Sequence, residues 1–185
     1  KFNSKKISGD VAIFYMQLKD LITRIKVEGE VINGYQVYRK QNSKRAVIKG
    51  VEAELNWMIV KTLKLSASMA YAKGQNVTGQ EPLRRIPPLN GRLIGSFNKN
   101  NWFVATEFLF ASKQRRLAQD DKEDNRIPAG GTPGWQVFNC YAGHQFKSAY
   151  INIGFQNILN EDYRTHGSGI NGVGRSGWIS FTLNL

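Results

Sequence analysis

The sequence from residue 51 to residue 71 reads VEAELNWMIVKTLKLSASMAY and decides the fold. Apolar residues take every second position on both sides of a break at Lys61-Thr62. The apolar set is Val51, Ala53, Leu55, Trp57 and Ile59 before the break, and Leu63, Leu65, Ala67, Met69 and Tyr71 after it. Strict alternation is typical of β-strands with one apolar face, and the short break predicts a tight hairpin.

The same alternation recurs along the whole chain and predicts about eight strands. Their approximate bounds are 10–27, 35–60, 63–74, 92–97, 102–114, 134–146, 150–159 and 177–185. Short connections at 61–62, 98–101 and 147–148 alternate with long ones at 28–34, 75–90, 115–133 and 160–174. Short turns at one end and long loops at the other are typical of a membrane barrel, whose strands cross the bilayer with about 9–11 residues. The predicted fold class is therefore all-β, an antiparallel up-and-down transmembrane β-barrel.

Carboxylates and aromatic residues are sorted as such a barrel requires. Glu52, Glu54 and Glu107 fall on the polar side of their strands, away from lipid. The strand-end aromatic residues are Trp57 and Trp102 beside short turns, and Tyr71 and Phe110 toward long loops. These positions match the two aromatic girdles of a membrane barrel. Trp178 is the exception, because its parity places it on the polar side, at a bulge or at a rim position.

Two other architectures share the alternation and stay open at this stage. A self-contained eight-stranded outer-membrane barrel, acting as an adhesin or a small pore, would pair the strand near 10–27 with the strand near 177–185. A soluble β-sandwich binding module would also alternate, but it has no reason to alternate short and long connections.

Composition narrows the function classes. The chain has 185 residues, enough for one sizeable domain, and it has no apolar run long enough for a transmembrane helix. The net charge of +12 falls largely in predicted loops, without a basic helix or an RNA-binding motif, so no nucleic-acid partner is expected. This charge is interpreted as solvated loop charge or, more specifically, as attraction to anionic lipopolysaccharide or to an anionic ligand. Cys140 is the single cysteine, so no disulfide within the chain and no thiolate metal site can form.

Several stretches resemble, in the same order, the barrels of TonB-dependent outer-membrane receptors. They are FYMQLKDLI at 14–22, IKGVEAEL at 48–55, IPP at 86–88 with NG at 90–91, and TPGW at 132–135. The end of the chain resembles this family most strongly. It has NILN at 157–160, YR at 163–164, HGSG at 166–169 and GRS at 174–176 before the last strand.

This resemblance implies a function that the strand pattern alone does not give. Residues 1–185 would be the C-terminal part of a receptor barrel of about 22 strands, forming a curved sheet, with the plug and N-terminal strands absent. The whole receptor would sit in the outer membrane and import a siderophore-type ligand, cobalamin or a glycan. It would contact the TonB complex through the missing plug and the barrel-assembly machinery through Leu185. No enzymatic activity and no cofactor are expected.

The candidate ligand contacts are loop residues. Arg84, Arg85, Arg115 and Arg116 can grip carboxylate or phosphate groups, and His166 lies in the last long loop. The acidic run at 120–124 lacks calcium-loop spacing and is interpreted as solvated charge. GSGING at 167–172 fits dinucleotide-binding spacing but has no helix after it, so a flexible loop is the better interpretation. No metal spacing links the two histidines, and no catalytic arrangement is legible.

Overall fold

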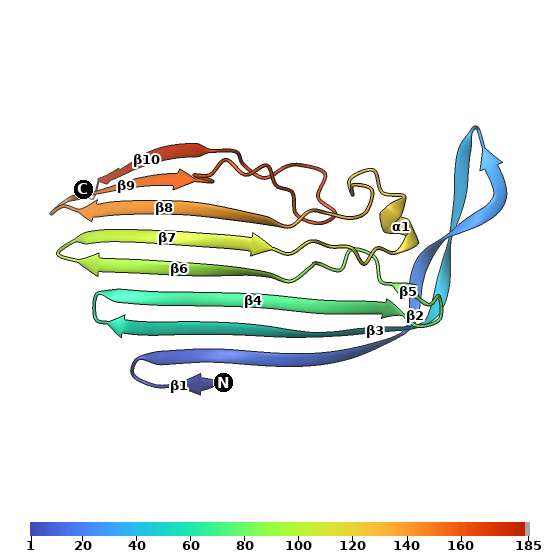
Figure 1. The fold of residues 1–185 in the computed structure, drawn as a ribbon, viewed down its shortest axis with the longest axis horizontal. Helices are drawn as coiled ribbons and strands as arrows, with labels where there is room; N and C mark the ends of the chain where they lie inside the picture. Colours follow the sequence, from blue (N-terminus) through green and yellow to red (C-terminus); the bar gives the residue numbers. More distant parts are fainter. Residues whose placement is uncertain (184–185) are drawn as a thin grey trace.

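The hairpin predicted at residues 51–71 lies within a curved antiparallel sheet (Figure 1). β3 (Tyr35–Val60) and β4 (Leu63–Asn76) meet at Lys61-Thr62, as their alternation predicts. Val51 pairs with Tyr71 across this hairpin, so the two apolar sets share one face.

The computed structural model describes residues 1–183, apart from the side chains of Thr23, Ser43 and Lys44. The expected contact of Leu185 with assembly machinery therefore falls outside the described residues. The other elements are β1 (Phe2–Asn3), β2 (Ile7–Ile32), β5 (Glu81–Pro82), β6 (Asn90–Lys99), β7 (Trp102–Ala111), α1 (Gln119–Lys122), β8 (Trp135–Gln145), β9 (Ala149–Gln156) and β10 (Ser176–Leu183).

The strands follow one another in the sheet as they do in the chain. Their order is β1-β2-β3-β4-β6-β7-β8-β9-β10, every neighbouring pair is antiparallel, and β5 pairs with β4 off this path. In Figure 1 the short turns that follow β1, β3, β6 and β8 lie at one end of the sheet, and the long connections with α1 and the tip of the β2–β3 hairpin lie at the other. The predicted up-and-down order is confirmed. The turn predicted at 98–101 shrinks to Asn100-Asn101, because β6 continues to Lys99.

The register separates an apolar face from a polar face. Members of the apolar face include Val11, Ile13, Val51, Leu55, Trp57, Met69, Leu93, Val104, Phe108, Phe138, Ile153, Phe155, Ile179 and Phe181. Members of the polar face include Asp10, Glu52, Glu54, Arg92, Glu107, Asn139, Tyr141 and Asn152. Many apolar-face side chains are exposed, with Ile13 at 84% and Ile179 at 72%. An apolar surface of this extent requires an apolar surrounding.

Trp178 keeps the parity that the sequence gives it. It pairs with Gly154, and β9 and β10 stay in register without a bulge, so Trp178 lies on the polar face. A Cβ at Gly154 would collide with the indole ring, and the ring centroid lies 6.4 Å from that of Tyr141. The absent side chain of Gly154 therefore makes the space for Trp178 on the polar face.

One loop prediction is wrong, and another lacks a short helix. The loop expected at 28–34 is a continuation of β2 and β3, which turn tightly at Asn33-Gly34 after a register shift between Lys26 and Val31. Asn33 and Gly34 both have positive φ, as a two-residue hairpin turn requires. The loop expected at 115–133 contains the short helix α1, which is too short to leave a periodic signal in the sequence.

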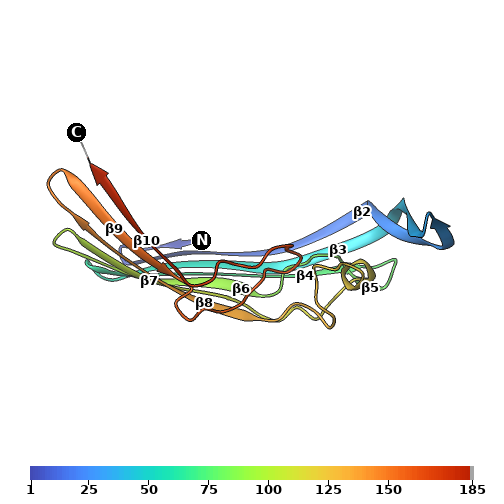
Figure 2. The same ribbon diagram turned by 90° about the horizontal axis from the view of Figure 1, so that it is seen from above.

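The sheet is open. Within residues 1–183, β1 and β10 are the two ends of the strand order, and β2 pairs with β1 and β3 rather than with β10. Figure 2 shows one curved layer. Neither a closed eight-stranded barrel nor a two-sheet sandwich describes this arrangement. Among the described residues, no helix has the length and apolar character needed to span a membrane.

Candidate functional site

The long connections meet at one end of the sheet, where the buried carboxylate of Asp121 joins two of them. Asp121 is fully buried in α1, within the β7–β8 connection, and it accepts hydrogen bonds from two backbone N–H groups. The donors are Ala118, at 3.2 Å from Oδ2, and Arg85, at 3.2 Å from Oδ1. Because Arg85 belongs to the β4–β6 connection, this carboxylate fixes one long loop onto the next.

Asp124 forms the centre of an arginine cluster beside Asp121. Its Oδ2 lies 3.3 Å from Arg84 Nη2, 3.1 Å from Arg85 Nη2 and 2.6 Å from Arg126 Nη2. The Asp124 side chain is only 5% exposed, whereas the arginines are 37–42% exposed. The arginines therefore hold the carboxylate on their inner edges and keep part of each guanidinium toward solvent.

The predicted solvated acidic run is thus wrong for its buried members. Asp120 also lies 3.7 Å from Arg84 Nη1, and partial burial raises the pKa of the Asp120 carboxyl. Glu123 is exposed, accepts a hydrogen bond from Tyr38 Oη at 2.6 Å, and thereby links the run to the β2–β3 hairpin. Hydrogen bonds from Gln119 and Tyr38 lower the pKa of Glu123.

His166 connects the last long loop to the β7–β8 connection, which carries Asp124 and Arg126. Its Nδ1 lies 2.8 Å from Thr132 Oγ1, and its Nε2 is buried with no hydrogen-bond partner among the described residues. Burial lowers the pKa of the His166 imidazole. A Cβ at neighbouring Gly167 would lie 3.6 Å from Arg85 Cδ, so the structure brings His166 and Arg85 into the same region.

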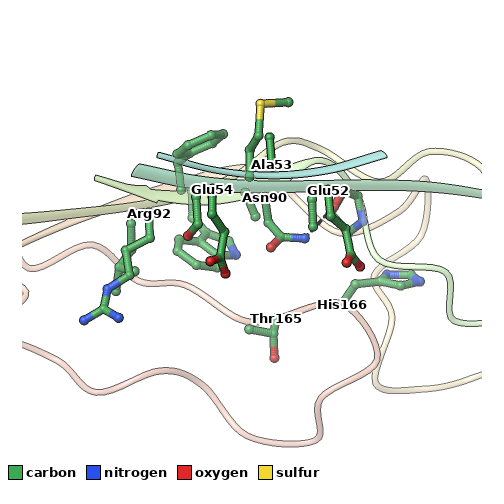
Figure 3. Close-up of a pocket in the computed structure, with 16 residues that line it drawn as sticks. Glu52, Ala53, Glu54, Asn90, Arg92, Thr165 and His166 are labelled. Carbon is green, nitrogen blue, oxygen red and sulfur yellow. Dashed lines mark hydrogen bonds between the residues drawn. The ribbon is translucent and has the colours of Figure 1, made fainter. Parts of the chain in front are cut away.

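A cavity of about 530 Å³ opens between the polar face and this loop. In Figure 3, Glu52, Glu54 and Arg92 lie on the same side of the sheet as His166, whereas Ala53 points to the opposite side. Carboxylates, a guanidinium and an imidazole can together hold a polar ligand through several charge-assisted hydrogen bonds.

A hydrogen-bond network supports one wall of the cavity. The buried Glu107 carboxylate pairs with Arg92, and it accepts hydrogen bonds from Asn139 Nδ2 at 2.7 Å and Tyr141 Oη at 3.0 Å. Asn139 Oδ1 in turn accepts from the Asn157 N–H at 2.8 Å, where the last loop begins. The network thus fixes the root of the loop that carries His166.

Within the described residues, neither Arg115 nor Arg116 forms a hydrogen bond or ion pair with the Asp124 cluster. Arg116 Nη2 donates to Gln75 Oε1 at 2.8 Å, and Gln75 shares the face of Lys73 on β4. Arg115 is exposed and makes no side-chain hydrogen bond or ion pair within the described part of the chain. Of the five predicted contacts, the structure therefore groups Arg84, Arg85 and His166.

Sequence reasoning missed Arg126 and the pairing of the acidic run with Arg84 and Arg85. Opposite charges in consecutive long loops were the available signal, since adjacent loops of an up-and-down sheet are neighbours. Among the described residues, no group of three or more His, Cys, Asp or Glu side chains could hold a metal ion.

Comparisons with known proteins agree on the architecture. Residues 1–160 match the family model described as "TonB dependent receptor-like, beta-barrel". No curated protein matches the chain.

Solved structures of similar fold are named as receptors and transporters. "Copper transporter OprC" aligns with a TM-score of 0.83 and 21% identity, over 98% of this chain and 29% of that one. A mutant of the ferric enterobactin receptor PfeA from Pseudomonas aeruginosa aligns with a TM-score of 0.72 and 14% identity, over 98% and 29%. The FrpB iron transporter from Neisseria meningitidis aligns with a TM-score of 0.69 and 14% identity, over 98% and 30%.

The chain thus spans about 29% of the length of the first solved structures that it matches. At these identities the likeness concerns the fold, while the family model covers most of the chain. The chain therefore belongs to the TonB-dependent receptor family, and its curved sheet is part of the β-barrel by which these receptors are integrated in the outer membrane.

Proposed function

We propose that the protein containing this sheet imports a scarce ligand across the outer membrane with energy relayed by TonB. The observation that carries the proposal is the cavity on the polar face, roofed by a loop that is hydrogen-bonded to the β7–β8 connection. In a receptor barrel the polar face lines the lumen and the long loops are extracellular. Members of this family are transporters rather than enzymes.

Residues 1–185 would be the C-terminal part of the barrel domain. The plug, its TonB-contacting segment and the remaining strands would come from other parts of the same protein. This chain would then supply barrel wall and extracellular loops, while coupling to TonB would occur through the plug.

The ligand is proposed to be a ferric siderophore, cobalamin or a glycan. The similar structures are named for copper, ferric enterobactin and iron, so scarce metal cargo is common among them. A catecholate or carboxylate siderophore would suit Arg84 and Arg85, because their guanidinium groups are partly exposed beside the cavity loop. His166 would add a hydrogen bond from the roof, and Arg115 would contact parts of a larger ligand. Arg116 donates to Gln75 on the apolar face and is left out of the proposed ligand site.

Uptake by cells that depend on this receptor tests the proposal. The probes are radioactive iron as ferric enterobactin, radioactive cobalt as cyanocobalamin, radioactive copper and a radiolabelled maltooligosaccharide. One probe should accumulate in cells with TonB and fail to accumulate in cells without it. If no probe accumulates in a TonB-dependent way, the transport proposal is overturned for these ligand classes.

Variants at the arginines test the binding residues separately. Arg84→Gln with Arg85→Gln should weaken probe binding at least about tenfold, because each hydrogen bond to a charged group contributes ~1.5–3 kcal/mol. Lys61→Gln with Lys99→Gln removes the same charge at short turns and should leave binding unchanged. Equal binding by both double variants would remove these arginines from the ligand site without affecting the transport proposal.

A further inference from the structure

The apolar face carries a row of basic residues at its edge toward the long loops. The basic residues of this row are Lys19 on β2, Arg45 and Lys49 on β3, and Lys73 on β4. The other residues of the apolar face at this level are Tyr15, Gln17, Val47, Tyr71 and Gln75. Lys49 pairs with Tyr15 on one side and with Lys73 on the other. Two exposed lysines thus stand directly opposite each other across neighbouring strands.

This position corresponds to the outer boundary of the bilayer. Lys49 lies eleven positions from Val60, the last residue of β3 before the short turn. At ~3.3 Å per residue and a strand tilt of ~40°, the rise is about 28 Å. The apolar band of a membrane barrel is about 25 Å tall, so the two ammonium groups reach the headgroup level of the outer leaflet.

No protein group neutralises these charges. Lys19, Arg45, Lys49 and Lys73 form no ion pair within the described part of the chain, whereas the carboxylates of β2–β4 in the bilayer region lie on the polar face. Like charges directly opposite each other in a sheet are destabilising. An anion from outside the protein that binds between the two lysines would therefore remove this repulsion.

A hollow at the same rim, on the side of β4 away from Lys49, offers room for part of a lipid headgroup. It has a volume of about 290 Å³, and its lining includes Tyr71, Lys113 and Arg116. Tyr71 precedes Lys73 by two positions on the same face. An aromatic ring and basic side chains at one rim position suit a group that is apolar below and anionic above.

We propose that Lys49 and Lys73, with the hollow beside Tyr71, bind a phosphate group of the anionic glycolipid in the outer leaflet. The two ammonium groups donate charge-assisted hydrogen bonds to phosphate oxygens, and the acyl chains lie along the apolar face below them. Lipopolysaccharide has this chemistry, since its lipid A carries phosphates directly above acyl chains. The site lies on the outside of the barrel and is independent of the imported ligand.

The test uses the full-length receptor purified in mild detergent and counts bound lipid by native mass spectrometry. The probes are diphosphoryl lipid A, its dephosphorylated form, phosphatidylglycerol and inorganic phosphate. Diphosphoryl lipid A should be retained by the receptor, and Lys49→Gln with Lys73→Gln should reduce its affinity about 30-fold. The control Lys61→Gln with Lys99→Gln removes two charges at the opposite rim and should change nothing.

Several results would overturn the assignment. Equal retention of dephosphorylated lipid A would show that phosphate is not recognised. Equal retention of phosphatidylglycerol, or displacement of lipid A by inorganic phosphate, would replace the glycolipid with a nonspecific anion. Heat-modifiable migration in gels verifies that each variant is folded, so a loss of lipid binding by a folded variant supports the site.

Discussion

Replacing Asp124 with asparagine should release the β7–β8 connection from its neighbours. The carboxylate holds Arg84, Arg85 and Arg126 at 2.6–3.3 Å, and the Asp124→Asn side chain keeps the shape but loses the charge. It also presents an amide N–H₂ to groups that only donate. The connection should therefore open more often, while the strands stay folded.

The size of the effect follows from how deeply the Asp124 carboxylate and its arginine partners are buried. Removing one partner of a fully buried ion pair costs about 3–5 kcal/mol. Here the carboxylate is 5% exposed, but the arginines are 37–42% exposed and can be rehydrated, which reduces the cost to ~2 kcal/mol. The open population of the loop should therefore rise about 30-fold.

Trypsin treatment of intact cells measures this opening. When opening is fast relative to cleavage, the cleavage rate follows the open population, so cleavage after Lys122 and Arg126 should accelerate about 30-fold. Glu30→Gln is the matched control, because it breaks an exposed pair with Arg39 whose side chains are 69% and 36% exposed. That pair contributes about 0–1 kcal/mol, and its loss should not affect the 112–134 connection. Equal cleavage of the connection in both variants would refute the anchoring role, and complete protection at high trypsin would contradict its extracellular position.

Three further predictions concern the barrel wall and the last loop. Glu107→Gln should destabilise the barrel by about 2 kcal/mol, because donors of the network lose their charged acceptor, and heat-modifiable gel migration should show unfolding at lower temperature. Gly154→Ala should cost ~1–3 kcal/mol by displacing the Trp178 ring, and Trp178→Ala should relieve the clash, so the two changes should be strongly non-additive in the same assay. Because burial lowers the pKa of His166, the loop's stability is fully present above the unfolded pKa of about 6.5 and is lost as pH falls through the lower folded pKa. Hydrogen exchange at 160–174, corrected for intrinsic rates, should increase at acidic pH, and His166→Gln should remove that dependence.

The strands were predictable because apolar and polar residues alternate along them, according to the face of the sheet on which each side chain lies. The faces of β3 and β4, the tight turn between them and the polar-face position of Trp178 all follow from parity. The Asn33-Gly34 dipeptide is a hairpin signal that the interpretation of 28–34 as a long loop did not use. In the structure Gly29 takes a positive φ of 77° within the irregular part of β2, and pairing resumes at Val31.

The loop cluster was not predictable in the same way, because its partners are far apart in sequence. Arg84 and Asp124 are 40 residues apart, and neither sits in a periodic pattern. The buried state of Asp121 depends on backbone N–H groups from two loops, and a backbone donor leaves no residue-type signal in the sequence. Sequence reasoning could therefore name Arg84, Arg85 and His166 as candidates but could not assign their internal partners.

The wall and the last loop form one hydrogen-bonded unit, which bears on how ligand specificity could change. The Asn157 N–H donates to Asn139, and its side chain donates to the carbonyls of Glu161 and Val173 at 2.8 and 2.9 Å. Asn157 therefore closes both ends of the loop onto β8, and neither Asn157 nor Asn139 lines the cavity. Substitutions at His166 leave these contacts intact, so the roof can vary while its position over the polar face is kept. Substitutions at Asn157 would instead move the whole roof, and with it the Thr132 contact that joins the loop to the β7–β8 connection.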